Sequence, residues 1–210
     1  MSTYKAFEVR EETEKNFVGT IVEKSALELA EGSVSIEVCY SSVNYKDALS
    51  ASGSKAVTRE YPHVPGIDAA GTVLASTDSN FAVGDEVVVT GYDLGMNTAG
   101  GFGQQVTVPG GWVTKLPVGL SLRDSMVLGT AGLTAGLCVN KLLLNGITPE
   151  AGKVLVTGAT GGVGIIACAL LVKLGFEVVA STGKLAETAK LTALGVSEVI
   201  SREAFSEENP

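Results

Sequence analysis

The segment Lys153-Val-Leu-Val-Thr-Gly-Ala-Thr-Gly-Gly-Val-Gly164 decides how the C-terminal part of this chain folds. A short apolar run at 154–156 stops at a cluster of glycines, and a longer apolar run at 165–174 follows. This order predicts a β-strand, a glycine-rich turn and an α-helix. Such a turn directs free backbone N–H groups and the positive end of the helix dipole at a phosphate. The segment therefore predicts a site for the diphosphate of a dinucleotide.

The spacing of the glycines departs from the standard G-x-G-x-x-G pattern, because Ala159 takes the first glycine position, followed by Gly161 and Gly164. On spacing alone, a glycine-rich surface turn is an alternative. The dinucleotide site is favoured by its surroundings, since alternating strands and helices are predicted to follow at 177–180, 185–194 and 198–200. We therefore expect an α/β fold of the Rossmann type, with a doubly wound parallel sheet.

The first part of the chain has a different pattern, in which short alternating runs are separated by glycine and proline. Apolar and polar side chains alternate strictly at 33–40, which predicts a half-buried strand. Further strands are predicted at 4–9, 69–74, 86–90 and 105–108. Many short strands with such turns are typical of a β-barrel or sandwich. We therefore predict a β domain at 1–120 and the N-terminal part of a nucleotide-binding domain at 121–210.

The periodicity changes at Ser121, where Ser121-Leu-Arg-Asp124 has the form of a helix-capping box with Asp in place of Glu. The apolar segment that follows to Leu144 is interrupted at 129–132, which predicts two helices. The segment 121–150 can belong to either domain. A complete doubly wound sheet would need roughly 60 to 90 further residues, so we expect the chain to be cut short.

Composition excludes several classes of function. The chain has 210 residues, a formal net charge of −8 and no cluster of basic residues, which argues against nucleic acid as a partner. Its three cysteines are too widely spaced for a disulfide framework or a zinc knot. Cys138 and Cys168, in apolar helical runs, are expected to be small core residues. Since the N-terminus does not have the form of a signal peptide and no uninterrupted apolar run reaches 18 residues, we expect a cytoplasmic protein without a membrane span.

Six ordered segments carry a resemblance over nearly the whole chain. They are SSVNYKDA at 41–48, PGIDAAGTV at 65–73, VGDEV at 83–87, GFG at 101–103, LGTAGLTA at 128–135 and TGATGGVG at 157–164. In these segments the chain resembles the medium-chain dehydrogenase/reductase superfamily, in its zinc-free quinone-oxidoreductase-like branch and the acryloyl-CoA reductase subgroup. The resemblance implies a GroES-like β-barrel domain before the Rossmann domain, a C-terminal third outside this chain, and a homodimer of the full-length protein.

The resemblance also implies a reaction, in which hydride from NADPH reduces the activated C=C bond of an enoyl thioester, or a quinone. The zinc-dependent members of the superfamily have a Cys and a Gly-His-Glu at the active site, where this chain has Ser41-Ser-Val-Asn44 and Gly66-Ile-Asp68. Asp68 alone cannot supply the three protein donors of a catalytic zinc, so no metal is expected. Hydrogen-bond donors would then stabilise the charge that develops on the substrate's carbonyl oxygen.

The candidate catalytic residues, by similarity to this subgroup, are Asn44, Asp68 and Tyr45. Asn44 is expected to orient the nicotinamide ribose or a substrate oxygen, or to cap a helix at 45–50. Asp68 is expected to be buried with a partner and to hold a polar network or relay a proton, with a surface carboxylate as the alternative. Tyr45 is either a donor to the carbonyl oxygen or an aromatic residue at the edge of the core. His63, the single histidine, is expected to have a structural or surface role.

The choice of coenzyme follows from the end of the second predicted strand, which reads Ser181-Thr-Gly-Lys184. An NAD enzyme usually has Asp or Glu there to bind the ribose 2′-OH, whereas hydroxyls and an ammonium attract a 2′-phosphate. NADP(H) is therefore expected, although a solvated Lys184 and packing threonines are alternatives. The candidate cofactor residues are Thr130 and Thr134 near the nicotinamide, Thr160, Gly161, Gly162, Val163 and Gly164 at the diphosphate, and Ser181, Thr182, Lys184 and, by resemblance, Arg202 at the 2′-phosphate.

Two other functions are open at this stage. The residues at 157–164 also fit the T-G-x-x-x-G-x-G motif of short-chain dehydrogenases, but those proteins begin with this motif and have a Tyr-x-x-x-Lys pair that this chain lacks. The chain could also be a module that binds NADPH without turnover, because a fold does not guarantee activity. In each case the expected partner is a small molecule.

Overall fold

The computed structural model describes residues 3–26 and 28–205. Two compact units divide the chain, Met1–Thr130 and Ala131–Pro210. The first unit thus ends within the segment 121–150, which the sequence analysis could not assign to either domain. The predicted boundary at residue 120 stays a prediction.

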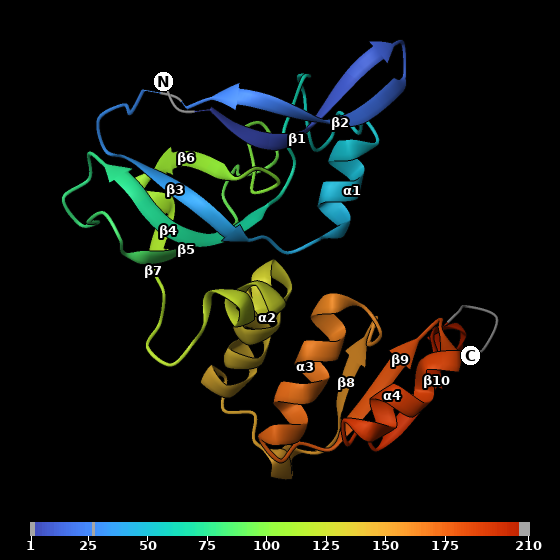
Figure 1. Cartoon of the computed structure of the whole chain (residues 1–210). Helices are drawn as coiled ribbons and strands as arrows, with labels where there is room; N and C mark the ends of the chain where they lie inside the picture. The colour runs from blue at the N-terminus through green and yellow to red at the C-terminus, as the bar shows by residue number, and fades with distance from the viewer. Residues whose placement is uncertain (1–2, 27, 206–210) are drawn as a thin grey trace. The chain divides into compact units, whose positions relative to one another are not determined.

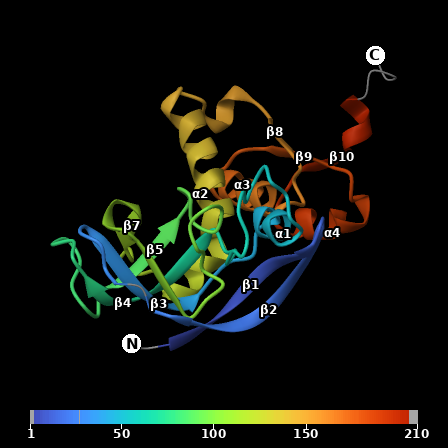
Figure 2. The ribbon, with the colours of Figure 1, turned by 90° about the horizontal axis from the view of Figure 1, so that it is seen from above.

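The first unit is built mainly of β-strands (Figure 1). An antiparallel sheet has the strand order β6-β3-β4-β5-β7 and a core of aliphatic side chains such as Val34, Ile36 and Val89. A long hairpin of β1 and β2 forms a second sheet, and one helix, α1, follows β3 (Figure 2). The elements are β1 (Thr3–Thr13), β2 (Asn16–Ser25), β3 (Ser33–Tyr40), α1 (Tyr45–Ala51), β4 (Asp68–Ser76), β5 (Glu86–Thr90), β6 (Gln105–Pro109), η1 (Gly110–Trp112) and β7 (Val113–Lys115).

All five strands predicted in this region are present, and two further strands, β2 and β7, were missed. The strict alternation predicted along β3 also ends early. A register shift between Val38 and Tyr40 interrupts the pairing of β3 with β4, and Tyr40 is exposed instead of joining the inward face. Such a bulge changes the direction in which the following side chains point, and a sequence pattern of period two does not predict it.

The second unit contains a parallel sheet with the order β10-β9-β8, in which helices connect consecutive strands (Figure 1). This arrangement confirms the predicted α/β fold with a partial Rossmann sheet. Its core combines Val139, Leu171 and Leu191 with the buried side of the sheet. The elements are η2 (Pro149–Ala151), β8 (Val154–Thr157), α3 (Gly162–Lys173), β9 (Val178–Thr182), η3 (Leu185–Glu187), α4 (Thr188–Ala193), β10 (Glu198–Ser201) and η4 (Arg202–Phe205).

Helix α2 (Leu122–Leu144) links the two units and is broken at Gly129, whose φ of 49° and ψ of −155° are not helical. The break confirms the predicted pair of helices. Ser121 caps the first of them, since its Oγ accepts the backbone N–H of Asp124 at 3.0 Å. Cys138 on α2 is exposed, so its prediction as a core residue is wrong, whereas Cys168 is buried as expected.

By length and composition α2 could cross a membrane, which the sequence analysis did not anticipate. Such a span needs about 20 continuous helical residues. The break at Gly129 leaves a longer part, 130–144, that falls short of this length. Length and composition are therefore weak support for a membrane span in this helix.

Candidate functional site

A buried carboxylate organises the candidate site of the first unit. Asp68 is the first residue of β4 and has an exposed fraction of 0%. Its Oδ2 accepts hydrogen bonds from the Ser42 hydroxyl and, at 2.9 Å, from the Asn44 side-chain amide. The Asn44 amide also donates to Ser42 Oγ at 3.0 Å. These contacts confirm that Asp68 is buried with partners and exclude the surface alternative.

The break in α2 supplies the other donors to Asp68. The backbone N–H of Thr130 donates to Asp68 Oδ2 at 2.9 Å, and the Thr130 hydroxyl donates to Oδ1 at 2.7 Å. A Cβ added at Gly129 would lie 2.7 Å from Asp68 Oδ2 and 2.8 Å from Ser42 Oγ. Glycine is thus required at 129 both by its positive φ and by the approach of the carboxylate.

Of the other two predicted catalytic residues, Asn44 contacts Asp68 and Tyr45 is exposed. Asn44 occupies the N-cap of α1 with extended backbone angles, as one of its predicted roles requires, while its side-chain amide donates to Asp68. Its other predicted role, toward the nicotinamide ribose or a substrate oxygen, stays a prediction. Tyr45 begins α1 with an exposed fraction of 80%, and its prediction as a core-edge aromatic is therefore wrong.

Asp47 is a site residue that the sequence analysis missed. This buried carboxylate accepts the backbone N–H of Asn44 at 2.7 Å, of Gly66 at 3.1 Å and of Ile67 at 2.9 Å. Burial raises the pKa of the Asp47 carboxyl, against the opposing effect of these hydrogen bonds. Asp47 therefore ties α1 to the turn before Asp68. The signal for it was Asp three residues after Asn44, the spacing of a capping box.

The chemistry of the Asp68 surroundings bears on metal binding. All the neighbours that contact the carboxylate present N–H or O–H donors, whereas a metal needs converging lone pairs. Among the residues that the structure describes, no group of three or more His, Cys, Asp or Glu could hold a metal ion. The arrangement instead suits a hydrogen-bond acceptor that orients Ser42, Asn44 and Thr130.

The turn between β8 and α3 has the form expected of a diphosphate site. Gly161 is the N-cap, so α3 begins at Gly162, before the predicted start at 165. A Cβ added at Gly164 would lie 2.3 Å from the carbonyl oxygen of Gly158, so only glycine allows the helix to pack this closely on the turn. The Gly161 N–H donates to that same carbonyl at 2.8 Å. The N–H groups of 162–164, in the first helical turn, therefore suit an anion better than that of Gly161.

A cavity of about 450 Å³ adjoins this turn at the C-terminal ends of the parallel strands. The hydroxyls of Thr160 and Thr182 lie 2.8 Å apart there, and the Lys184 backbone N–H donates to Thr182 Oγ1 at 3.0 Å. The cavity brings together six of the predicted cofactor residues with two that were missed, Gly158 and Gly183; the six are Thr160, Gly161, Ser181, Thr182, Lys184 and Arg202. The described residues that line the cavity include two basic residues and several with hydroxyls but no acidic residue, and such a set fits a phosphorylated ribose.

The other predicted cofactor residues do not line this cavity. Gly162, Val163 and Gly164 form the first turn of α3, while Thr130 and Thr134 lie four residues apart on α2 and so share one side of it.

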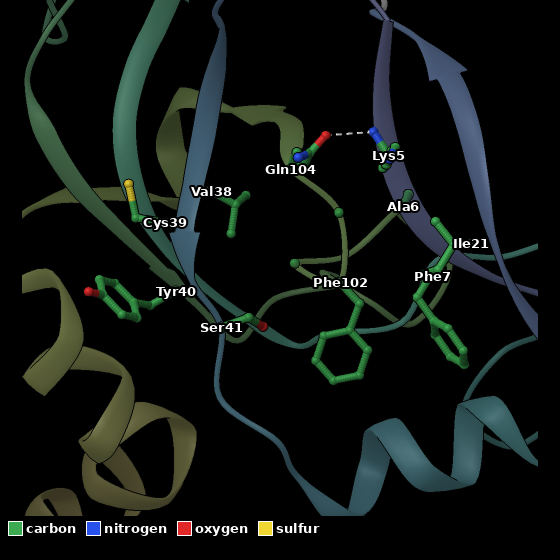
Figure 3. Close-up of a pocket in the computed structure, with 12 residues that line it drawn as sticks. Lys5, Ala6, Phe7, Ile21, Val38, Cys39, Tyr40, Ser41, Phe102 and Gln104 are labelled. Atoms are coloured by element: carbon green, nitrogen blue, oxygen red, sulfur yellow. Dashed lines mark hydrogen bonds between the residues drawn. The ribbon is translucent and has the colours of Figure 1, made fainter.

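The first unit has a separate apolar cavity of about 380 Å³ between β1, β3 and the glycine loop at 101–103 (Figure 3). The rings of Phe7 and Phe102 lie at one end of it, whereas Cys39 and Tyr40 lie on the opposite side and point away from these rings. The backbone N–H of Lys5 donates to the side chain of Gln104 at 2.8 Å across the other end. No predicted site residue lines this cavity.

His63 has the structural role that was predicted for it. It is buried, and its backbone exchanges two hydrogen bonds with Val9 of β1, at 2.8 and 2.9 Å. Burial lowers the pKa of its imidazole, and Nε2 has no hydrogen-bond partner among residues 3–26 and 28–205.

Comparison with known proteins agrees with this geometry. Residues 30–118 match the alcohol dehydrogenase GroES-like domain. The chain is 53% identical over 179 residues to "Putative quinone oxidoreductase YhfP" of Bacillus subtilis, covering 85% of this chain and 54% of that protein. It is 46% identical over 183 residues to acrylyl-CoA reductase AcuI of Ruegeria pomeroyi, covering 87% and 56%. The chain thus spans about half the length of these curated relatives.

Solved structures show the same similarity in three dimensions. The yhdH oxidoreductase of Salmonella enterica, in complex with NADP, superposes with a TM-score of 0.92 at 43% identity, covering 97% of this chain and 62% of that one. The Bacillus subtilis protein yhfP, with NAD bound, gives 0.92 at 46% identity, covering 99% and 63%. The chain belongs to the medium-chain dehydrogenase/reductase superfamily. Within it, the similarity is to the quinone oxidoreductases and acrylyl-CoA reductases, as the resemblance predicted.

Proposed function

We propose that this chain is the N-terminal part of an NADPH-dependent reductase that acts without zinc on an activated C=C bond or a quinone. The observation that carries the proposal is the cavity beside the β8–α3 turn. Lys184 and Arg202 line it together with Thr160 and Thr182, whose hydroxyls lie 2.8 Å apart, and none of the described residues that line it is acidic. A carboxylate would repel a 2′-phosphate, whereas these groups attract one.

The proposed coenzyme fits the backbone as well as the side chains. The first turn of α3 presents the N–H groups of 162–164, and Gly164 lets this turn pack closely on Gly158; these N–H groups would hold the diphosphate. Ser181, Thr182, Lys184 and Arg202 would hold the adenosine end, and Thr130 and Thr134 the nicotinamide end. NADPH supplies a hydride when bound. The NADP-bound relative supports this choice, although the yhfP structure contains NAD.

The residues around Asp68 act by positioning. Asp68 accepts four hydrogen bonds and is fully buried, so we propose that it holds the polar network and does not relay a proton. It fixes Asn44, which orients the nicotinamide ribose or the substrate oxygen, and it fixes Thr130 at the break in α2. The exposed hydroxyl of Tyr45 is available to donate to the carbonyl oxygen.

The proposal also includes the acceptor substrate, the cell compartment and the partners of the protein. The acceptor is a small enoyl thioester or a quinone, by analogy with the names of the relatives. All three cysteines are free, in keeping with a reducing cytoplasm. As the family resemblance implies, we propose a homodimer for the full-length protein, with no nucleic acid or membrane as partner.

Titration with NADPH and NADH, followed by assays with acrylyl-CoA and a quinone, tests the proposal. We expect Lys184→Ala to weaken NADPH about tenfold and to leave NADH unchanged, since only NADPH carries the 2′-phosphate. Equal losses for both coenzymes would refute the assignment of the 2′-phosphate. Coenzyme binding without reduction of either acceptor would support a binding module instead.

A further inference from the structure

Gly183 lines the proposed 2′-phosphate site but has no charged group with which to bind a phosphate. Its φ lies outside the positive range that favours glycine, so the backbone would accept another residue. A Cβ added there would, however, lie 2.9 Å from Arg202 Nε, 3.0 Å from Cδ and 3.1 Å from Cζ. The guanidinium of Arg202 therefore occupies the space that a side chain at 183 would need.

The sheet brings these two residues together. Gly183 directly follows β9 and Arg202 directly follows β10, and the parallel register pairs Ser201 with Thr182. The carboxyl ends of parallel strands meet at one edge, which puts the loop after β9 beside the start of η4. On the other side of Gly183, the hydroxyl of Thr182 holds the Lys184 backbone N–H at 3.0 Å. The loop that supports Arg202 is thus itself fixed.

We propose that Gly183 is a specificity-determining residue, because its bare backbone is the surface on which the guanidinium of Arg202 rests. The inference depends on the proposed NADPH site and adds a residue to it that makes no charged contact itself. A guanidinium held flat is preorganised to form two parallel hydrogen bonds to a phosphate. A methyl group at 183 displaces this guanidinium and with it the preference for the 2′-phosphate.

Gly183→Ala in the full chain tests this inference, with adenosine 2′,5′-bisphosphate and 5′-AMP as calorimetric probes. The two probes share the adenosine and differ in the 2′-phosphate. We expect the bisphosphate to bind about tenfold more weakly to the variant and 5′-AMP to bind unchanged. Since the clash is with the flexible end of a side chain, the melting temperature should stay near that of the wild type.

Two further variants separate the role of Gly183 from a general effect. Gly111→Ala is the matched control, because a Cβ there meets nothing within 4 Å and its φ is not positive; both probes should bind as to the wild type. Arg202→Ala should lose as much affinity for the bisphosphate as Gly183→Ala does. In the double variant the two losses should not add, because both act through one guanidinium.

Several results would overturn the inference. If Arg202→Ala loses the preference for the bisphosphate and Gly183→Ala keeps it, Gly183 has no part in specificity, while the proposed coenzyme stands. Additive losses, equal losses for both probes, or a large drop in melting temperature for Gly183→Ala would each show that it acts in another way. A wild-type protein that does not prefer the bisphosphate would refute the proposed NADPH site as well.

Discussion

At the scale of single residues, the meaning of a buried carboxylate depends on which atoms surround it. Asp68 and Asp47 are both buried within the first unit. Asp68 accepts mainly side-chain donors and so positions other polar groups, whereas Asp47 accepts three backbone N–H groups and so fixes the chain itself. Both are satisfied by hydrogen bonds, as buried charge requires. Apart from the contact of Asp47 with Asn44, which has the spacing of a capping box, these partners were not visible in the sequence.

His63 gives a prediction of pH dependence. Its folded-state pKa lies below the ordinary value of 6.5, because burial disfavours the charged imidazole. The unfolded chain therefore binds more protons just below pH 6.5, and the stabilisation present above that value is lost as the pH falls from it through the lower folded-state pKa. We expect the free energy of unfolding, measured in urea, to decrease from about pH 7.5 to about pH 5.5.

The variant His63→Leu is the control for this prediction, since it removes the titrating group from the same buried position. Its stability should depend less on pH across this range. Asp47 has the opposite effect, because its raised pKa means that acidification favours the folded state in the window above its ordinary value. An unchanged slope in His63→Leu would show that another group titrates there.

At the scale of secondary structure, the break in α2 links the helix to the candidate site. Gly129 adopts a left-handed φ, and the next residue then donates both its N–H and its hydroxyl to Asp68. A continuous helix would direct the Thr130 N–H back to its own preceding turn. The irregularity thus provides a donor that a regular helix would not.

Gly129→Ala should destabilise the protein by about 1–3 kcal/mol, because it combines a strained φ with a clash at Asp68. Gly136→Ala on the same helix is the control. A Cβ at Gly136 meets nothing within 4 Å, and alanine favours the helix, so stability should rise by up to about 1 kcal/mol. Chemical denaturation of both variants measures the difference, and similar values for the two would contradict the role assigned to the break.

At the scale of the whole molecule, the described residues form two hydrophobic cores with no residue in common. One is formed by the antiparallel sheet of the first unit and the other by the parallel sheet and its helices. Separate cores allow separate cooperative unfolding. This separation has a consequence for ligand binding, because a ligand stabilises the structure that holds it.

We expect NADP to increase hydrogen-exchange protection chiefly in β8, α3 and β9, where the proposed diphosphate and 2′-phosphate sites lie. The strands β3 and β4 should change less. NAD at the same concentration should give the smaller increase, since it lacks the 2′-phosphate. Equal increases across both cores would show that they unfold as one cooperative unit.

The sequence determined most of the architecture. Periodicity of two and the glycine-rich turn were enough for five of the seven strands of the first unit and for the parallel sheet of the second, because these signals are local. The break at Gly129 and the cap at Ser121 were likewise readable from neighbouring residues. The strands β2 and β7, the bulge in β3 and the exposure of Cys138 were not, since each depends on what packs against the element.

For the candidate site, the family resemblance supplied Asn44, Asp68 and Arg202, and the end of the second predicted strand supplied Ser181, Thr182 and Lys184. Gly158 and Gly183, which line the same cavity, were missed. Only the tertiary structure showed that Asp68 is enclosed by donors from two segments, the loop at 42–44 and the break in α2. It also showed that Asp47 anchors the turn before Asp68 and that Arg202 lies against Gly183. These contacts join residues that are far apart along the chain. Their distances are set by strand register and packing, and no local pattern encodes them.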